Sequence, residues 1–190
     1  MKKYQKLILL QLALTLADFI LTYRGTPDLE LEANPLVMHF GVGWNVLILS
    51  NILFMAVYIP LVWYAFAVYK SPLIHYTKYT EFISMLCYDR PDKFGWTVTK
   101  VPKNWVKLFG AMLGYAAGYT LPLCRIIIVA EWAVYLKSPD LFHKYDDIRE
   151  KFPFKRIDTA AAMVLFVFLA IWWTYRECKI NRIKLDKIIN

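Results

Sequence analysis

The sequence predicts an all-α polytopic membrane protein, with four transmembrane helices joined by short interfacial or loop helices. Of its 190 residues, 58% are hydrophobic, against about 45–50% in an ordinary soluble domain, and the mean hydropathy is +0.37. The charged residues, 20% of the chain, lie between four long apolar runs, as in polytopic membrane proteins. This apolar content also excludes a disordered chain. We therefore treat residues 1–190 as a single membrane domain.

The first two apolar runs are residues 7–23 and 44–69. The first has 17 residues, near the lower limit for crossing a bilayer. Three lysines precede it, as in a signal peptide, but no cleavage site of the A-x-A kind follows and Asp18 interrupts the run. We therefore interpret it as a retained span. The second run contains Pro60.

The third and fourth runs are residues 105–136 and 157–175. As a helix the third would be about 48 Å long at about 1.5 Å per residue, which exceeds a hydrocarbon core of about 30 Å. It must therefore tilt, kink at Pro122 or protrude. The fourth is followed by a charged tail, 176–190, that lacks Gly and Pro, so we expect its helix to continue into water.

Two loops are expected to contain helices of their own. Ser138, Pro139 and Asp140 place a capping residue, a first-turn proline and an acidic residue in the order that starts a helix. We expect that helix to end near residue 152. Segment 73–87 mixes aromatic and charged residues, which favours a helix lying along the membrane surface.

The distribution of basic residues predicts the orientation. The N-terminus, the loop 70–104 and the tail are rich in Lys and Arg, whereas the loop 24–43 has a single one. Four spans place these three basic regions on the same side, which is then cytoplasmic. The loop 137–156 also has six basic residues and argues against this orientation. We expect a prokaryotic cytoplasmic (inner) membrane, with both termini in the cytoplasm.

Polar residues inside the spans are the strongest candidates for a functional site. Four residues of the first span are spaced by 4, 3 and 4 and so share one helical face: Gln11, Thr15, Asp18 and Thr22. Asn51 and Arg125 lie at compatible depths in other spans, so we expect one buried polar cluster. Lipid offers polar groups no partners. The cluster is interpreted as a structural ion pair, a proton or ion relay, or a contact with a partner subunit.

A second motif is a face of small residues in the third span. Gly110, Gly114 and Gly118 recur every four residues, a spacing that lets helix backbones approach closely in lipid. The partner helix belongs either to the same chain, which we favour slightly, or to a second copy.

The first 40 residues contain A-D-F-I-L-T, with Asp18 and Thr22, followed by E-A-N-P, with Glu32, Asn34 and Pro35. This combination resembles an uncharacterised family of small bacterial, archaeal and phage membrane proteins. The resemblance implies a membrane protein, marks these five residues for attention and supplies no activity. Asn34 and Pro35 favour a turn or re-entry of the chain. Glu32 is expected to cap a following helix, to meet the cluster around Arg125, or to be a solvated loop acid.

The sequence favours a non-catalytic membrane subunit that acts as a scaffold or assembly partner. It has no H-x-x-x-H, nucleophile-elbow or phosphate-loop motif, and its three cysteines form no C-x-x-C. We therefore expect no metal and no cofactor. The net charge of +8 is assigned to lipid headgroups rather than nucleic acid. Expected partners are the bilayer and other membrane subunits or further copies. The alternatives are a homo-oligomeric ion channel or transporter, of the kind used in stress or antiviral defence, and a membrane-embedded lipid-acting enzyme.

Overall fold

The computed structural model describes residues 1–30, 35–91, 101–102, 104–150 and 157–189. Every regular element within these ranges is a helix, and four helices are long and apolar enough to cross a membrane. The predicted fold class is thereby confirmed. The elements are α1 (Lys3–Gly25), α2 (Pro35–Phe40), α3 (Trp44–Trp63), the π-helix η1 (Tyr64–Val68), α4 (Tyr79–Tyr88), α5 (Trp105–Lys137), α6 (Pro139–Glu150) and α7 (Ile157–Ile189).

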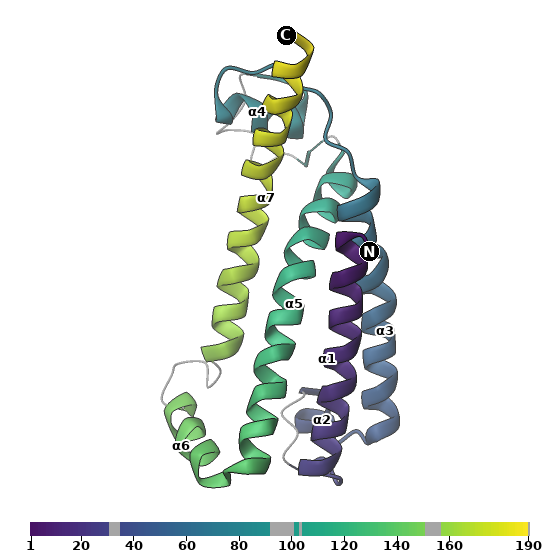
Figure 1. Ribbon diagram of the computed structural model, residues 1–190, viewed down its shortest axis with the longest axis vertical. Coiled ribbons are helices and arrows are strands. Elements are labelled where there is room, and N and C mark those ends of the chain that lie inside the picture. The colour runs from purple at the N-terminus through teal and green to yellow at the C-terminus, as the bar shows by residue number, and fades with distance from the viewer. Residues whose placement is uncertain (31–34, 92–100, 103, 151–156, 190) are drawn as a thin grey trace.

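The long helices are arranged around α5. Figure 1 shows α5 between α7 on one side and α1 with α3 on the other, and α5 packs against all three. Helices α1 and α5 run in one direction and α3 and α7 in the opposite one. Helix α4 and the C-terminus lie at the end of the molecule from which α1 starts, whereas α2 and α6 lie at the other end. The arrangement therefore combines a three-helix unit, α1–α3–α5, with α7 packed on its outer side.

The helices extend beyond the apolar runs that predict them. Helix α1 starts at Lys3, where the backbone N–H of Lys2 donates to Gln5 Oε1 at 2.8 Å. The charged tail belongs to α7, which runs without a break to Ile189. Charged side chains do not interrupt a helix where it leaves the hydrocarbon. Hydropathy alone therefore predicts helices that are shorter than the observed ones.

The two intrahelical prolines have different consequences. After Pro60, α3 passes into the π-helix η1, which closes with a hydrogen bond from Tyr69 N to Tyr64 O at 2.8 Å. A single π-helical turn commonly absorbs an irregularity inside a helix. Pro122 leaves α5 continuous over 33 residues, or about 50 Å. Because this exceeds a hydrocarbon core of about 30 Å, α5 protrudes or tilts rather than breaking.

The small-residue face of α5 packs against α3 and η1 within the same chain. A Cβ at Gly114 would overlap the carbonyl oxygen of Leu61 and lie 2.8 Å from Ala65 Cβ. A Cβ at Gly118 would lie 3.1 Å from Phe66, whereas at Gly110 it would meet no atom closer than 3.5 Å. The closest approach of the two backbones is therefore at Gly114.

Helix α4 docks on the far end of α7 through a small core of its own. Ile74, Phe82 and Leu86 are buried together, and the Tyr76 hydroxyl donates to the carbonyl of Cys178 at 2.9 Å. At the opposite end of the molecule, α6 starts after Ser138 as the sequence predicts. Its expected end near residue 152 lies outside the described residues.

Candidate functional site: a buried polar network

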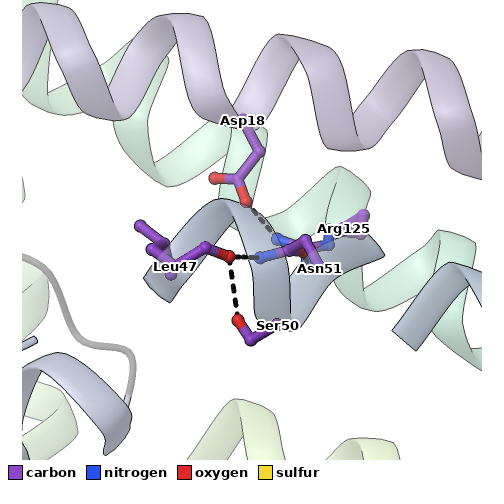
Figure 2. A network of polar contacts seen from close by, with 5 residues as sticks. All are labelled: Asp18, Leu47, Ser50, Asn51 and Arg125. Carbon is purple, nitrogen blue, oxygen red and sulfur yellow. Dashed lines mark hydrogen bonds and ion pairs between the residues drawn. The ribbon is translucent and has the colours of Figure 1, made fainter. Parts of the chain in front are cut away.

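An ion pair between α1 and α5 forms the centre of the polar network. Arg125 Nη1 donates to the carboxylate of Asp18, and Arg125 Nη2 donates to Asn51 Oδ1 on α3 at 2.6 Å. Asn51 Nδ2 donates in turn to the carbonyl of Leu47 at 3.0 Å, and the Ser50 hydroxyl donates to that same carbonyl at 2.8 Å. Figure 2 shows these five residues meeting between the helices. One guanidinium therefore connects three spans.

The network is largely shielded from its surroundings. The Asp18 side chain is 12% exposed and the Arg125 side chain 20%, and Asn51 as a whole is 8% exposed. A charged side chain at mid-membrane costs about 2.5–3.5 kcal/mol on insertion scales. Pairing and the hydrogen bonds of the network offset much of the insertion cost of both charges.

Helical rise explains why these residues meet. A Cβ added at Gly118 would lie 3.5 Å from Leu7, near the start of α1, and 3.6 Å from Val62 on α3. These three residues therefore define a common layer across the three helices. Asp18 follows Leu7 by eleven residues, and Asn51 precedes Val62 on the antiparallel helix by the same number, so both lie about 16 Å below it. Arg125 starts about 10 Å below the layer, and its long side chain covers the remaining distance.

A second group of polar atoms lies between this layer and the ion pair. Gln11 is 0% exposed, and neither of its amide atoms has a hydrogen-bond partner among the described residues. The hydroxyl groups of Thr15 and Tyr58 are buried and unpartnered in the same sense. Gln11 and Tyr58 each lie four residues from the common layer, or about 6 Å. These side chains therefore extend the polar region from the ion pair toward the start of α1.

Pro122 adds a backbone acceptor at this depth. Proline has no N–H, so the carbonyl four residues earlier, at Gly118, lacks its intrahelical donor. In membranes such carbonyls are satisfied by side chains or ordered water. Thr120, on the same helix, has a further buried hydroxyl without a partner among the described residues.

The structure brings together most of the residues that the sequence singles out. Gln11, Thr15, Asp18 and Thr22 are all buried along α1, and Asn51 and Arg125 join them. Glu32 and Asn34 lie outside the described residues. Pro35 starts α2, and its side chain also lies outside them, so the three expectations for Glu32 remain predictions.

Sequence reasoning missed part of the network. Tyr58 is seven residues after Asn51 and therefore on the same helical face. This spacing is sufficient to predict from the sequence that Tyr58 belongs to the network. Thr120 shares no such spacing with Arg125. The carbonyl of Leu47 carries no sequence signal, because every residue has one.

The loop that follows α1 is ordered by its own hydrogen bonds. Asp28 Oδ1 accepts from the Thr26 hydroxyl at 2.8 Å and from the Glu30 N–H at 3.1 Å. The backbone bond from Glu30 and the hydroxyl of Thr26 hold the pKa of Asp28 below its usual value. Trp44 Nε1 donates to the Pro27 carbonyl at 2.8 Å, which ties this loop to the start of α3.

No protein-family model, curated protein or solved structure matches the chain. The resemblance of the first 40 residues to a family of small membrane proteins therefore stays a prediction. Within the described residues, no group of three or more His, Cys, Asp and Glu side chains is placed to hold a metal ion.

Proposed function

We propose that the chain is a non-catalytic subunit of a membrane complex, which presents an ordered platform outside the bilayer to other membrane subunits or to further copies of itself. The observation that supports this most is the clamp between Asn181 and Ile74. Asn181 Nδ2 donates to the Ile74 carbonyl at 2.7 Å, and Asn181 Oδ1 accepts from the Ile74 N–H at 3.2 Å.

The length of α7 indicates that the clamp lies beyond the hydrocarbon. Asn181 is 24 residues after Ile157, or about 36 Å along the helix, against a core of about 30 Å. Asn181 is 1% exposed, so both of its bonds are shielded from water. A platform that is already ordered loses less conformational entropy when a partner binds.

The platform carries positive charge. Four basic side chains on the last turns of α7 are exposed: Lys179, Arg182, Lys184 and Lys187. They lie at the same end as the start of α1 (Figure 1), which agrees with a cytoplasmic position for both termini under the positive-inside rule. We accordingly place this end of the protein at the anionic cytoplasmic leaflet of a prokaryotic inner membrane.

Particle mass in native lipid tests the proposal. The chain is extracted with a lipid-retaining polymer, and its particles are weighed by native mass spectrometry. We expect complexes with more than one polypeptide, and we expect Asn181→Ala to lose the added chains while Met163→Ala, an exposed change on the apolar part of α7 and outside the platform, keeps them. Particles holding a single copy of the chain and nothing else would contradict the proposal, as would an intact complex in Asn181→Ala.

A proton or ion path is the second candidate function. The unpartnered buried atoms of Gln11, Thr15 and Tyr58 favour it, because polar atoms at membrane depth line water-filled paths or contact other helices. They lie between the common layer and Asp18, which is the only acidic residue of α1. Liposomes that contain the purified chain and a pH-sensitive dye test this candidate.

Proton flux is expected in the wild type and its loss in Asp18→Asn. Asp28→Asn, the same change in the loop outside the spans, serves as the matched control and should retain the flux. If the wild type conducts nothing in sealed liposomes, or if both variants lose flux equally, the second candidate is wrong.

A further inference from the structure

A cavity of about 340 Å³ lies where α4 meets α5 and α7. Its size is within the range of about 300–1,000 Å³ that is typical of small-molecule sites. Most of its wall is apolar, with Leu86 from α4 and Leu108, Phe109 and Met112 from α5. Such a wall suits a hydrocarbon chain rather than a polar metabolite.

One side of this cavity adjoins a buried group of polar atoms. Trp173 lines the cavity and is 2% exposed, and its indole N–H has no acceptor among the described residues. Its ring packs on Tyr69 with 5.5 Å between centroids. The hydroxyls of Tyr69 and Ser71 are buried as well and have no hydrogen-bond partner among the described residues. The Cys87 thiol is also in the cavity wall, and Glu177 lies one turn after Trp173 on the same face of α7.

The chemistry of these atoms selects a headgroup. The indole N–H of Trp173 only donates, so the complementary group is an oxygen with accessible lone pairs. The Glu177 side chain is 7% exposed, whereas that of its ion-pair partner Arg176 is 39% exposed. The carboxylate therefore disfavours an anionic headgroup beside it. A hydroxyl or carbonyl oxygen fits, whereas a phosphate or carboxylate does not.

The position of the cavity determines how such a molecule would enter. Trp105, in its wall, begins α5, and tryptophan is enriched at the membrane–water interface. Helix α4 lies at the end of the molecule from which α5 starts (Figure 1). We propose that this cavity binds a neutral amphiphile from the bilayer, a hydrocarbon chain that ends in a hydroxyl or carbonyl oxygen, with that oxygen accepting from the indole N–H of Trp173.

The full chain in lipid nanodiscs is photolabelled with a long-chain alcohol that carries a diazirine, and the labelled peptides are mapped by mass spectrometry. We expect saturable labelling of residues 86–87 and 105–112. Unlabelled hexadecanol, a diacylglycerol and an isoprenoid quinone compete in separate arms, which distinguishes an alcohol, an ester and a quinone as the source of the oxygen. Palmitate, with the same chain length as hexadecanol and an anionic head, should compete at least tenfold less well than hexadecanol.

Trp173→Phe removes the N–H and keeps an aromatic ring in the wall, and we expect it to weaken hexadecanol competition by about fivefold to tenfold. Trp172→Phe is the matched control, because Trp172 is 46% exposed and stacks on Phe168 away from the cavity. Labelling that does not saturate, that is equally strong on the exposed faces of α1, or that responds equally to both variants would overturn the proposal. Equal competition by palmitate and hexadecanol would overturn it without any variant.

Discussion

Arg125 on α5 and Asp18 on α1 are 107 residues apart in the sequence and form an ion pair across the interface between two spans. The pair is not isolated, because Asn51 on α3 binds the second guanidinium nitrogen. Three helices are thereby aligned at one depth. The network makes the alignment specific, since sliding any one helix by a turn would leave a charge or an amide unpaired in hydrocarbon.

The first prediction concerns this pair. Arg125→Leu leaves the Asp18 carboxylate buried without its partner, and we expect it to lower the free energy of unfolding by about 3–5 kcal/mol. The double variant Asp18→Leu/Arg125→Leu removes both charges and should recover much of that loss. Unfolding in mixed detergent micelles measures both effects. Lys107→Leu, an exposed change on the same helix, should cost less than about 0.5 kcal/mol. Losses that merely add would contradict the coupling.

The second prediction concerns the small-residue face of α5. Gly114→Ala forces a Cβ against the Leu61 carbonyl and Ala65, and overpacking of this kind costs about 1–3 kcal/mol. Gly110→Ala adds a Cβ that meets only the Tyr64 ring, at 3.5 Å, so it should be neutral or stabilising through better helix propensity. The same unfolding assay compares the two variants. Equal losses would show that the close approach is not limited to Gly114.

The sequence is sufficient to predict the spans and much of the polar network. Hydrocarbon satisfies no polar group, so a stripe of Gln, Thr and Asp on one span must face protein. Among the described residues inside the other spans, Arg125 is the cation at the depth of Asp18, which makes the pair predictable from charge and depth. No comparable rule selects Asn51 over other amides, and its position followed only from its depth.

The extramembrane platform could not be predicted in the same way. The clamp joins the side chain of Asn181 to the backbone of Ile74, and a backbone amide is present at every position of a chain. From the sequence alone, the tail around Asn181 is therefore indistinguishable from a solvated helix. The π-helix after Pro60 could not be predicted either. A proline in the sequence shows that one intrahelical hydrogen bond is lost, but it does not show how the following turns rearrange.

The third prediction tests the platform directly. Asn181→Ala removes both hydrogen bonds to Ile74. The buried backbone N–H and carbonyl of Ile74 then lack partners, which costs about 1–3 kcal/mol per unsatisfied group. We expect faster hydrogen exchange across Ile74–Tyr88 and unchanged exchange in α1. Lys179→Ala, exposed on the same helix, controls for a general effect on α7. Protection that persists in Asn181→Ala would mean that Phe82 and Leu86 alone hold α4 in place.

The fourth prediction is a pH dependence at the start of α4. Glu81 Oε2 accepts from the Thr77 N–H at 2.7 Å and from the Thr77 hydroxyl at 2.8 Å. These two bonds hold the pKa of Glu81 below its ordinary value of 4.5. Because the folded pKa is lowered, the stabilisation is complete above the ordinary value and is lost as the pH falls through the lowered one.

We therefore expect the Thr77 amide resonance, followed by NMR in small bicelles, to shift as the pH falls from about 5 to about 3, together with faster exchange in the first turn of α4. Glu81→Gln keeps an oxygen acceptor and removes the titration, so its Thr77 amide should stay constant over the same range. A shift of equal size in Glu81→Gln would assign the titration to another acid and contradict the role of Glu81. Asp28→Asn, which removes the lowered-pKa acid at the opposite end of the molecule, should leave the wild-type shift of Thr77 unchanged.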